Sequence, residues 1–195
     1  MKPRFVLLLL LLPGCLAQQL DRMKDQAAAG QTATLAAEQV DCGGSDPFCV
    51  QAQALHAEAC LALARQAPHD AAAAGHRACA ERGYAAALAA LPPGAAARRA
   101  LLAGLGAAAM ERRDAGEASP DTQLAAGQAL LALDPADAIG CSHVRSARLA
   151  RALLGPPGPA RCAELRAVPA CPANPALDRQ IAAQTSAACP EETGR

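Results

Sequence analysis

The sequence predicts an all-α, disulfide-stapled protein made of antiparallel helix pairs, arranged as a helical-repeat-like array or as an irregular helical bundle. Two observations predict the helices. Alanine, the best helix former, dominates the chain, and no stretch of alternating β-branched residues suggests a strand. The third observation is the cysteine count, which is nine in all and eight once Cys15 is set aside. Because alanine buries little apolar surface, covalent staples would strengthen such a core.

Proline-rich and glycine-rich breaks divide the chain into helices. The polar, alanine-rich segment 18–30 suits a tether or a loosely held first helix. Further helices are expected over about 31–40, 47–66, 71–91, 95–114, 120–133, 136–154 and 174–188, with a short turn over 162–166. Ser45 or Asp46 is suited to cap the helix that has Pro47 in its first turn. Residues 31–190 thus form one cysteine-rich helical domain, followed by a flexible tail over 191–195.

Residues 1–17 have the pattern of a secretion signal. Lys2 and Arg4 precede an unbroken apolar run over 5–12. That run is too short for a membrane-spanning helix, which needs about 20 apolar residues. The small residues Cys15 and Ala17 fit cleavage after Ala17, which would release a soluble periplasmic or secreted chain beginning at Gln18.

The stretch Leu12-Pro13-Gly14-Cys15 resembles the lipobox of bacterial lipoproteins, although Pro13 departs from that pattern. The resemblance implies lipid attachment at Cys15, which would become the new N-terminus. Leu16, and not an aspartate, follows the cysteine. By the same resemblance, this favours an outer-membrane lipoprotein facing the periplasm over the soluble alternative.

Two stretches resemble tetratricopeptide repeats: 83–88, Gly-Tyr-Ala-Ala-Ala-Leu, and 129–137, where a helix gives way to a proline turn. Pro68 and Pro135 are separated by about two periods of roughly 34 residues. The intermediate break, near residue 101, falls inside an expected helix. Cysteine-rich Sel1-like repeats are a second partial resemblance. Both resemblances imply a scaffold that holds a protein or peptide on a concave face.

The eight remaining cysteines are expected to form disulfides, because an even number of cysteines in an exported chain indicates that they are paired. Residues equidistant from a turn meet across an antiparallel helix pair. This rule predicts Cys42–Cys49 and Cys60–Cys79, each centred on a turn. It also predicts a nested arrangement for the last four cysteines, namely Cys141–Cys189 and Cys162–Cys171.

The principal interpretation includes no metal site, but one alternative is open. His56 precedes Cys60 by four positions and His76 precedes Cys79 by three, so each pair can share a helix face. These two histidines and two cysteines could satisfy tetrahedral zinc. An oxidising compartment favours the disulfide instead.

Composition argues against several function classes. The net charge is zero, so no basic face for nucleic acid is expected. No nucleophile elbow, zinc-protease motif or phosphate-binding loop is present. The arginines at 98–99, 112–113 and 145–151 are interpreted as exposed charges, with a clamp for a peptide carboxylate as the alternative. Gly104 and Gly106 are interpreted as positions of close helix packing.

We therefore expect a non-catalytic, lipid-anchored helical scaffold without a cofactor, which binds another envelope protein or peptide. The alternatives are a structural subunit of an envelope or secretion assembly and, third, an enzyme of unknown type.

Overall fold

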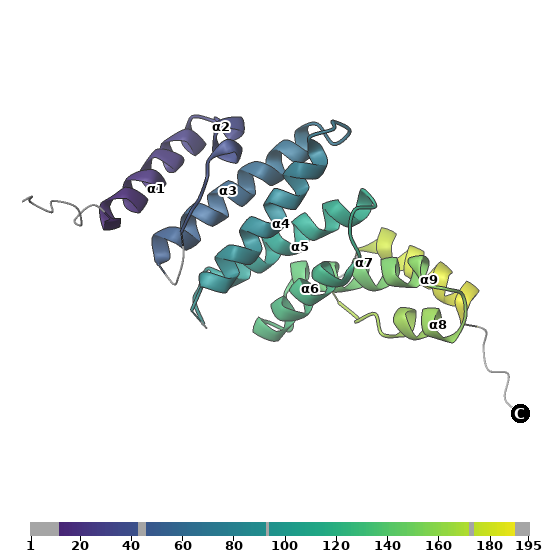
Figure 1. Cartoon of the computed structure of the whole chain (residues 1–195). Coiled ribbons are helices and arrows are strands. Elements are labelled where there is room, and N and C mark those ends of the chain that lie inside the picture. Colours follow the sequence, from purple (N-terminus) through teal and green to yellow (C-terminus); the bar gives the residue numbers. More distant parts are fainter. Residues whose placement is uncertain (1–11, 43–45, 93, 172–173, 190–195) are drawn as a thin grey trace, which may run out of the picture.

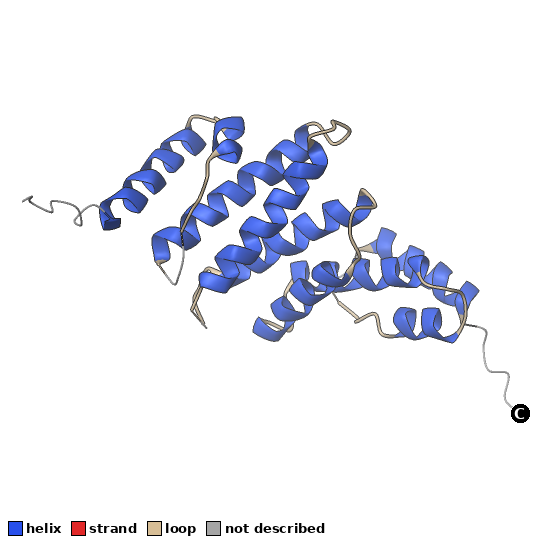
Figure 2. Cartoon of the chain, viewed as in Figure 1, coloured by secondary structure: helices blue, strands red, loops and turns tan. Residues whose placement is uncertain are grey.

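The computed structural model describes residues 12–42, 46–92, 94–171 and 174–189, leaving out the side chains of 12–15. All regular structure in these ranges is helical (Figure 2). The helices of the described chain are α1 (Leu12–Ala28), α2 (Thr32–Ala37), α3 (Pro47–Gln66), α4 (Ala73–Ala90), α5 (Arg98–Asp114), α6 (Asp121–Leu133), α7 (Ala138–Leu154), α8 (Pro159–Arg166) and α9 (Pro175–Ala188).

Carboxylate side chains fix where two of the longer helices begin. Asp46 accepts a hydrogen bond of 2.8 Å from the backbone N–H of Phe48 at the start of α3. Asp137 accepts one of 2.8 Å from the N–H of Gly140 in α7. Each bond satisfies a backbone donor that has no partner inside the helix. Asp46 is one of the two caps expected for α3, and the other, Ser45, lies outside the described residues.

The helices are stacked in a row in chain order, with α1 and α2 at one end and α8 and α9 at the other (Figure 1). Each helix packs against the next one in the sequence. Alternate helices also touch along one layer, α1 with α3, α3 with α5 and α5 with α7. The helices range from 6 residues in α2 to 20 in α3, so the stacked units are unequal in size.

The apolar core is divided in the same way, because each cluster joins helices that are neighbours in the chain. The largest lies between α3, α4 and α5 and includes Cys60 and Tyr84. Smaller clusters lie between α1, α2 and α3, between α6 and α7, and at the C-terminal end between α7, α8 and α9. Stability in such an array comes from interfaces between neighbours.

The segment 18–30, expected to be a tether or a loosely held helix, is part of α1 up to Ala28. Leu20 and Met23 are 1% and 0% exposed and pack against Leu35 and Ala52. They lie three positions apart, so they share one face of the helix. Two large apolar side chains therefore fasten α1 to α3, although most of its residues are polar or alanine.

The first part of the expected signal, residues 1–11, lies outside the described residues. The backbone of Cys15 is part of α1, but the side chain of Cys15 is not among the described atoms. Lipid attachment there stays a prediction. Among the described helices, none is long and apolar enough to cross a membrane. Four disulfides connect the eight other cysteines and indicate an oxidising, exported environment.

The N-terminal two disulfides are those expected from the sequence. Cys42 and Cys49 are joined across the turn that leads into α3, with Cα atoms 5.7 Å apart. Cys60 of α3 and Cys79 of α4 are joined at a Cα separation of 5.9 Å. Both separations are ordinary for disulfides.

The expected pairing of the last four cysteines is wrong. The structure joins Cys141 to Cys171 and Cys162 to Cys189, in place of Cys141–Cys189 and Cys162–Cys171. The reason is α8: the sequence pattern predicts only a short turn there, which would leave α7 paired directly with α9. In the structure α8 packs against both α7 and α9. Cys171 lies in the segment that follows α8, and Cys141 and Cys171 are equally far from Pro156 in the break between α7 and α8.

Several helices approach so closely that only glycine fits between them. A Cβ atom on Gly104 would lie 2.3 Å from Cε1 of Tyr84, where α5 crosses α4. A Cβ atom on Gly127 would lie 2.9 Å from the carbonyl oxygen of Gly140, where α6 meets α7. These contacts confirm that the glycines near 104 serve close helix packing.

Candidate functional site

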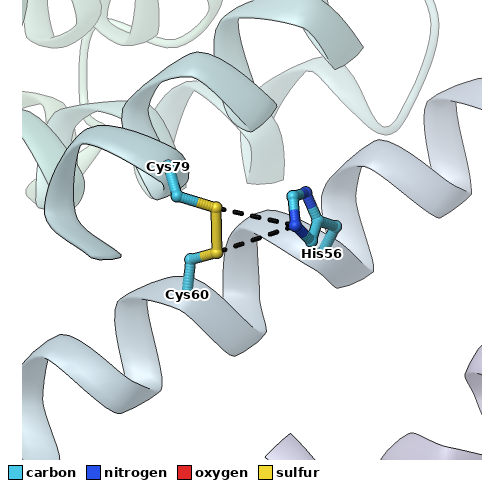
Figure 3. A group of neighbouring side chains, drawn as sticks. All are labelled: His56, Cys60 and Cys79. Atoms are coloured by element: carbon cyan, nitrogen blue, oxygen red, sulfur yellow. Dashed lines mark hydrogen bonds between the residues drawn. A yellow bond between two sulfur atoms is a disulfide. The ribbon is translucent and has the colours of Figure 1, made fainter. Parts of the chain in front are cut away.

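One group of chemically reactive side chains gathers where α3 packs on α4 (Figure 3). His56 and Cys60 lie one turn apart on α3 and point to the same side, as positions i and i+4 do. Cys79 reaches them from α4. The hairpin turn between these helices lies near residues 67–72 and brings the two cysteines to the same level.

The His56 side chain lies beside the disulfide. Its Nε2 is 3.6 Å from Sγ of Cys79 and 3.8 Å from Sγ of Cys60. The same nitrogen is 3.2 Å from the carbonyl oxygen of Ala36, in the last turn of α2. A carbonyl oxygen only accepts, so Nε2 carries the proton and donates to Ala36. The imidazole thus ties α2 to α3 while it contacts both sulfur atoms.

Of the four residues in the alternative metal set, the structure brings three together. The ligand atoms of His56, Cys60 and Cys79 all lie within 4.8 Å of one another. His76 does not belong to this group, although it lies one turn before Cys79 on α4. Positions i and i+3 differ in direction on a helix, so the cysteine can reach His56 and Cys60 without its neighbour His76. In the disulfide, neither sulfur is a thiolate, the form that binds metals.

A groove of about 510 Å³ opens onto this group. One wall is the extended segment 38–41 between α2 and α3, and the other is α4. The lining residues are Glu38, Gln39, Val40, Asp41, Gln53, His56, Cys79, Arg82, Gly83 and Ala86. The linker 38–41 and the Arg82 side of α4 therefore face each other across this space.

The wall formed by 38–41 is held in place from both sides. Gln53 of α3 donates a hydrogen bond of 3.2 Å to the carbonyl oxygen of Val40. Gln19 of α1 donates one of 2.9 Å to that of Gln39. The Cys42–Cys49 disulfide then fixes the end of the segment to the first turn of α3. The groove is thus formed before anything enters it.

Glu38 ties the start of the linker to α1, because its carboxylate binds Gln26 and Arg22 of that helix. A hydrogen bond from Gln26, and then a hydrogen bond and ion pair from Arg22, hold the pKa of Glu38 below its usual value. Glu38 is therefore an anion at neutral pH. The sequence pattern predicts one helix over 31–40 and therefore does not reveal this wall. The structure ends α2 at Ala37.

Most of the arginines that were expected to be exposed form ion pairs between helices of the same chain. Arg145 is 6% exposed and pairs with Asp178, joining α7 to α9. Arg112 pairs with Glu81 at 2.9 Å, joining α5 to α4. Because these guanidinium groups already bind carboxylates of the same chain, the structure does not assemble them into a clamp for a peptide carboxylate.

A second histidine, His143, is buried away from the groove and 6% exposed. Its Nδ1 lies 3.5 Å from Nε2 of Gln123 in α6. Its ring packs against Gly106 of α5, where a Cβ atom would approach the ring to 2.6 Å. Burial lowers the pKa of His143. The nearby carboxylate of Asp137 opposes this shift and the Arg113 cation adds to it, both more weakly than burial.

The folded protein should therefore lose stability as the pH falls below about 6.5, the ordinary histidine pKa. Below that pH the unfolded chain binds a proton at residue 143 that the folded chain excludes. The expected loss approaches at most about 1.4 kcal/mol per pH unit, the limit for one proton. Urea denaturation of the protein and of His143→Gln between pH 7.5 and 5 measures it.

The matched control is His69→Gln, which removes a histidine on the exposed turn between α3 and α4. We expect His69→Gln to keep the pH dependence and His143→Gln to flatten it. Equal slopes in the parent protein and in His143→Gln would show that this side chain is not the cause.

Comparisons of the chain with protein-family models, with curated proteins and with solved structures find no match.

Proposed function

We propose that this protein is a non-catalytic helical scaffold of the bacterial envelope, anchored to the outer membrane by a lipid on Cys15 and facing the periplasm. Its partner is an extended segment of another envelope protein, bound in the groove between 38–41 and α4. The single observation that carries this proposal is the groove, whose two walls are built and locked by the chain itself. A site that is ordered before binding loses less conformational entropy when its ligand arrives.

The groove offers chemistry suited to a peptide. Along the extended wall 38–41, the carbonyl oxygens of Gln39 and Val40 already accept hydrogen bonds from Gln19 and Gln53, so an added extended chain would pair with the other backbone groups of this wall. Asp41 on one wall and Arg82 on the other supply charges of opposite sign. Opposite charges on facing walls set the direction in which a charged segment lies.

A photo-crosslinking amino acid tests the proposal. Placed at Ala86, an exposed groove position on α4, it should trap an envelope protein in living cells. Placed at Ala125, an exposed position of α6 outside the groove, it should trap none. Arg82→Glu should abolish the Ala86 product, because it reverses the charge of one wall. Equal products from both positions, or a product that is indifferent to Arg82→Glu, would contradict the groove as the binding site.

The same cells test the anchor. Cys15→Ser should move the protein from the membrane fraction to the soluble fraction, because the lipid is attached through the cysteine sulfur. Intact mass of the parent protein should show acyl chains on Cys15. A mature chain that begins at an unmodified Gln18 would rule out the anchor and leave the groove proposal standing.

A structural subunit of an envelope or secretion assembly is the second candidate, and one observation favours it. Leu133 and Ile139 flank the turn between α6 and α7 and are 50% and 41% exposed. Exposed apolar side chains at one turn of a helix pair can pack against another protein.

A further inference from the structure

We propose that His56, Cys60 and Cys79 form a zinc(II) site when the Cys60–Cys79 disulfide is open, so that the cation and the disulfide exclude each other. The proposal concerns the chemistry of these three side chains and does not depend on what the groove binds.

Distances carry the first step of the argument. Zinc binds thiolate sulfur at about 2.3 Å and imidazole nitrogen at about 2.0–2.1 Å, so tetrahedral ligands N and S lie about 3.6 Å apart. Nε2 of His56 lies 3.6 Å from the sulfur of Cys79 and 3.8 Å from that of Cys60. Two edges of the tetrahedron are therefore already present. The third edge, between the sulfurs, is about 3.8 Å in such a site.

The two sulfur atoms can move apart to this distance while the helices stay in place. The Cα atoms of Cys60 and Cys79 are 5.9 Å apart, and two short side chains that rotate about their Cα–Cβ bonds can separate the sulfurs by the extra distance. His56 needs only to exchange a partner. Its Nε2 proton, now donated to Ala36, leaves and Nδ1 carries the proton instead.

Charge favours a divalent cation. Cys60 is 0% exposed, so an uncompensated charge at its sulfur is costly. Two thiolates and one neutral imidazole carry a charge of −2, which zinc(II) neutralises, whereas copper(I) would leave one negative charge buried. Thiolate and imidazole are also ligand types that zinc prefers.

Access and the fourth position come from the groove. His56 and Cys79 both line it, so a hydrated cation reaches them without passing through the core. Three protein ligands with a water molecule on the groove side complete a tetrahedron.

The redox balance is simple. A dithiol reduces the disulfide: each cysteine sulfur gains one electron and one proton, and the dithiol becomes its own disulfide. Zinc then binds Cys60 and Cys79 as thiolates, and two protons pass to solvent. A newly made chain in which the cysteines are not yet joined reaches the same state without a reductant.

The test uses the full chain with every cysteine except Cys60 and Cys79 replaced by alanine, and circular dichroism to verify that it is helical. After reduction and removal of oxygen, zinc is titrated in competition with a chromophoric chelator. We expect one zinc per reduced chain and none per oxidised chain. His56→Gln should weaken binding by more than about tenfold. The matched variant His76→Gln should bind as the parent does, because His76 lies outside the group.

Binding that is indifferent to His56→Gln, that falls equally with His76→Gln, or that persists in the oxidised chain would overturn the proposal. If the multiple variant does not fold, the parent chain supplies the readout. Reduced parent protein is alkylated with and without zinc, and the labelled cysteines are located by mass spectrometry. Zinc should protect Cys60 and Cys79 but not Cys42 and Cys49, and equal labelling of all four contradicts the site.

Discussion

Replacing Gly104 by alanine should destabilise the protein by about 1–3 kcal/mol, the usual cost of overfilling a packed core. The new Cβ atom would lie 2.3 Å from Cε1 and 2.4 Å from Cζ of Tyr84. The tyrosine ring cannot swing aside, because it is itself buried in the cluster between α3, α4 and α5. Either the ring or α5 must therefore move. Urea denaturation followed by circular dichroism measures the change.

Gly75→Ala is the matched control. Gly75 also lies in a helix, α4, but a Cβ atom there meets nothing within 4 Å. Since alanine is the better helix former, this change should stabilise the protein by about 0.5–1 kcal/mol. In a Tyr84→Leu background, Gly104→Ala should be less harmful, because the ring atoms that it strikes are gone. The same effect for both glycine variants would show that close packing at Gly104 is not required.

Removal of the Cys60–Cys79 disulfide, by the double change Cys60→Ala and Cys79→Ala, should reduce the free energy of unfolding by about 3 kcal/mol. The bridge closes a loop with a sequence separation of 19. The entropy that it removes from the unfolded chain accounts for roughly that amount. Cys60 also belongs to the largest apolar cluster, so its smaller replacement leaves a space in the core.

The Cys42–Cys49 bridge supplies the comparison, because it closes a loop with a separation of only 7. Its removal should cost about 2.5 kcal/mol by the same entropy relation. It should also leave the packing between α3 and α4 unchanged. Denaturant unfolding of both double variants ranks them. A larger loss of unfolding free energy from the Cys42–Cys49 pair would contradict the expectation that the Cys60–Cys79 bridge contributes more to stability.

Most of the helix pattern could be predicted because proline, glycine and capping residues mark the breaks. The expected 47–66 matches α3, and 174–188 differs from α9 by one residue at its start. The end of α2 and the helix α8 are not predicted, because their signals in the sequence are weak. α2 ends at Ala37, before any proline or glycine. α8 has only 8 residues, too few to show a helical period.

The site could be predicted only in part, since sequence spacing places residues on a helix but does not set the rotation of that helix. The spacings of four in His56/Cys60 and three in His76/Cys79 both allow the pair to share a helix face, yet only the first pair contributes its histidine. The groove depends on the 38–41 segment crossing from α2 to α3, and its position follows from tertiary contacts such as Gln53 with Val40. The buried arginines escaped prediction for the same reason.

The connectivity of the disulfides has a consequence for the order in which the chain can be oxidised. A chain that leaves a membrane pore from its N-terminus presents its cysteines one after another. Cys42–Cys49 and Cys60–Cys79 each join two cysteines that follow one another in the chain. Oxidation of each cysteine with the next one to emerge therefore forms these two native disulfides directly. The last four are interlaced, and consecutive oxidation would first join Cys141 to Cys162. The N-terminal half can therefore mature with an oxidant alone, whereas the C-terminal half calls for thiol–disulfide reshuffling.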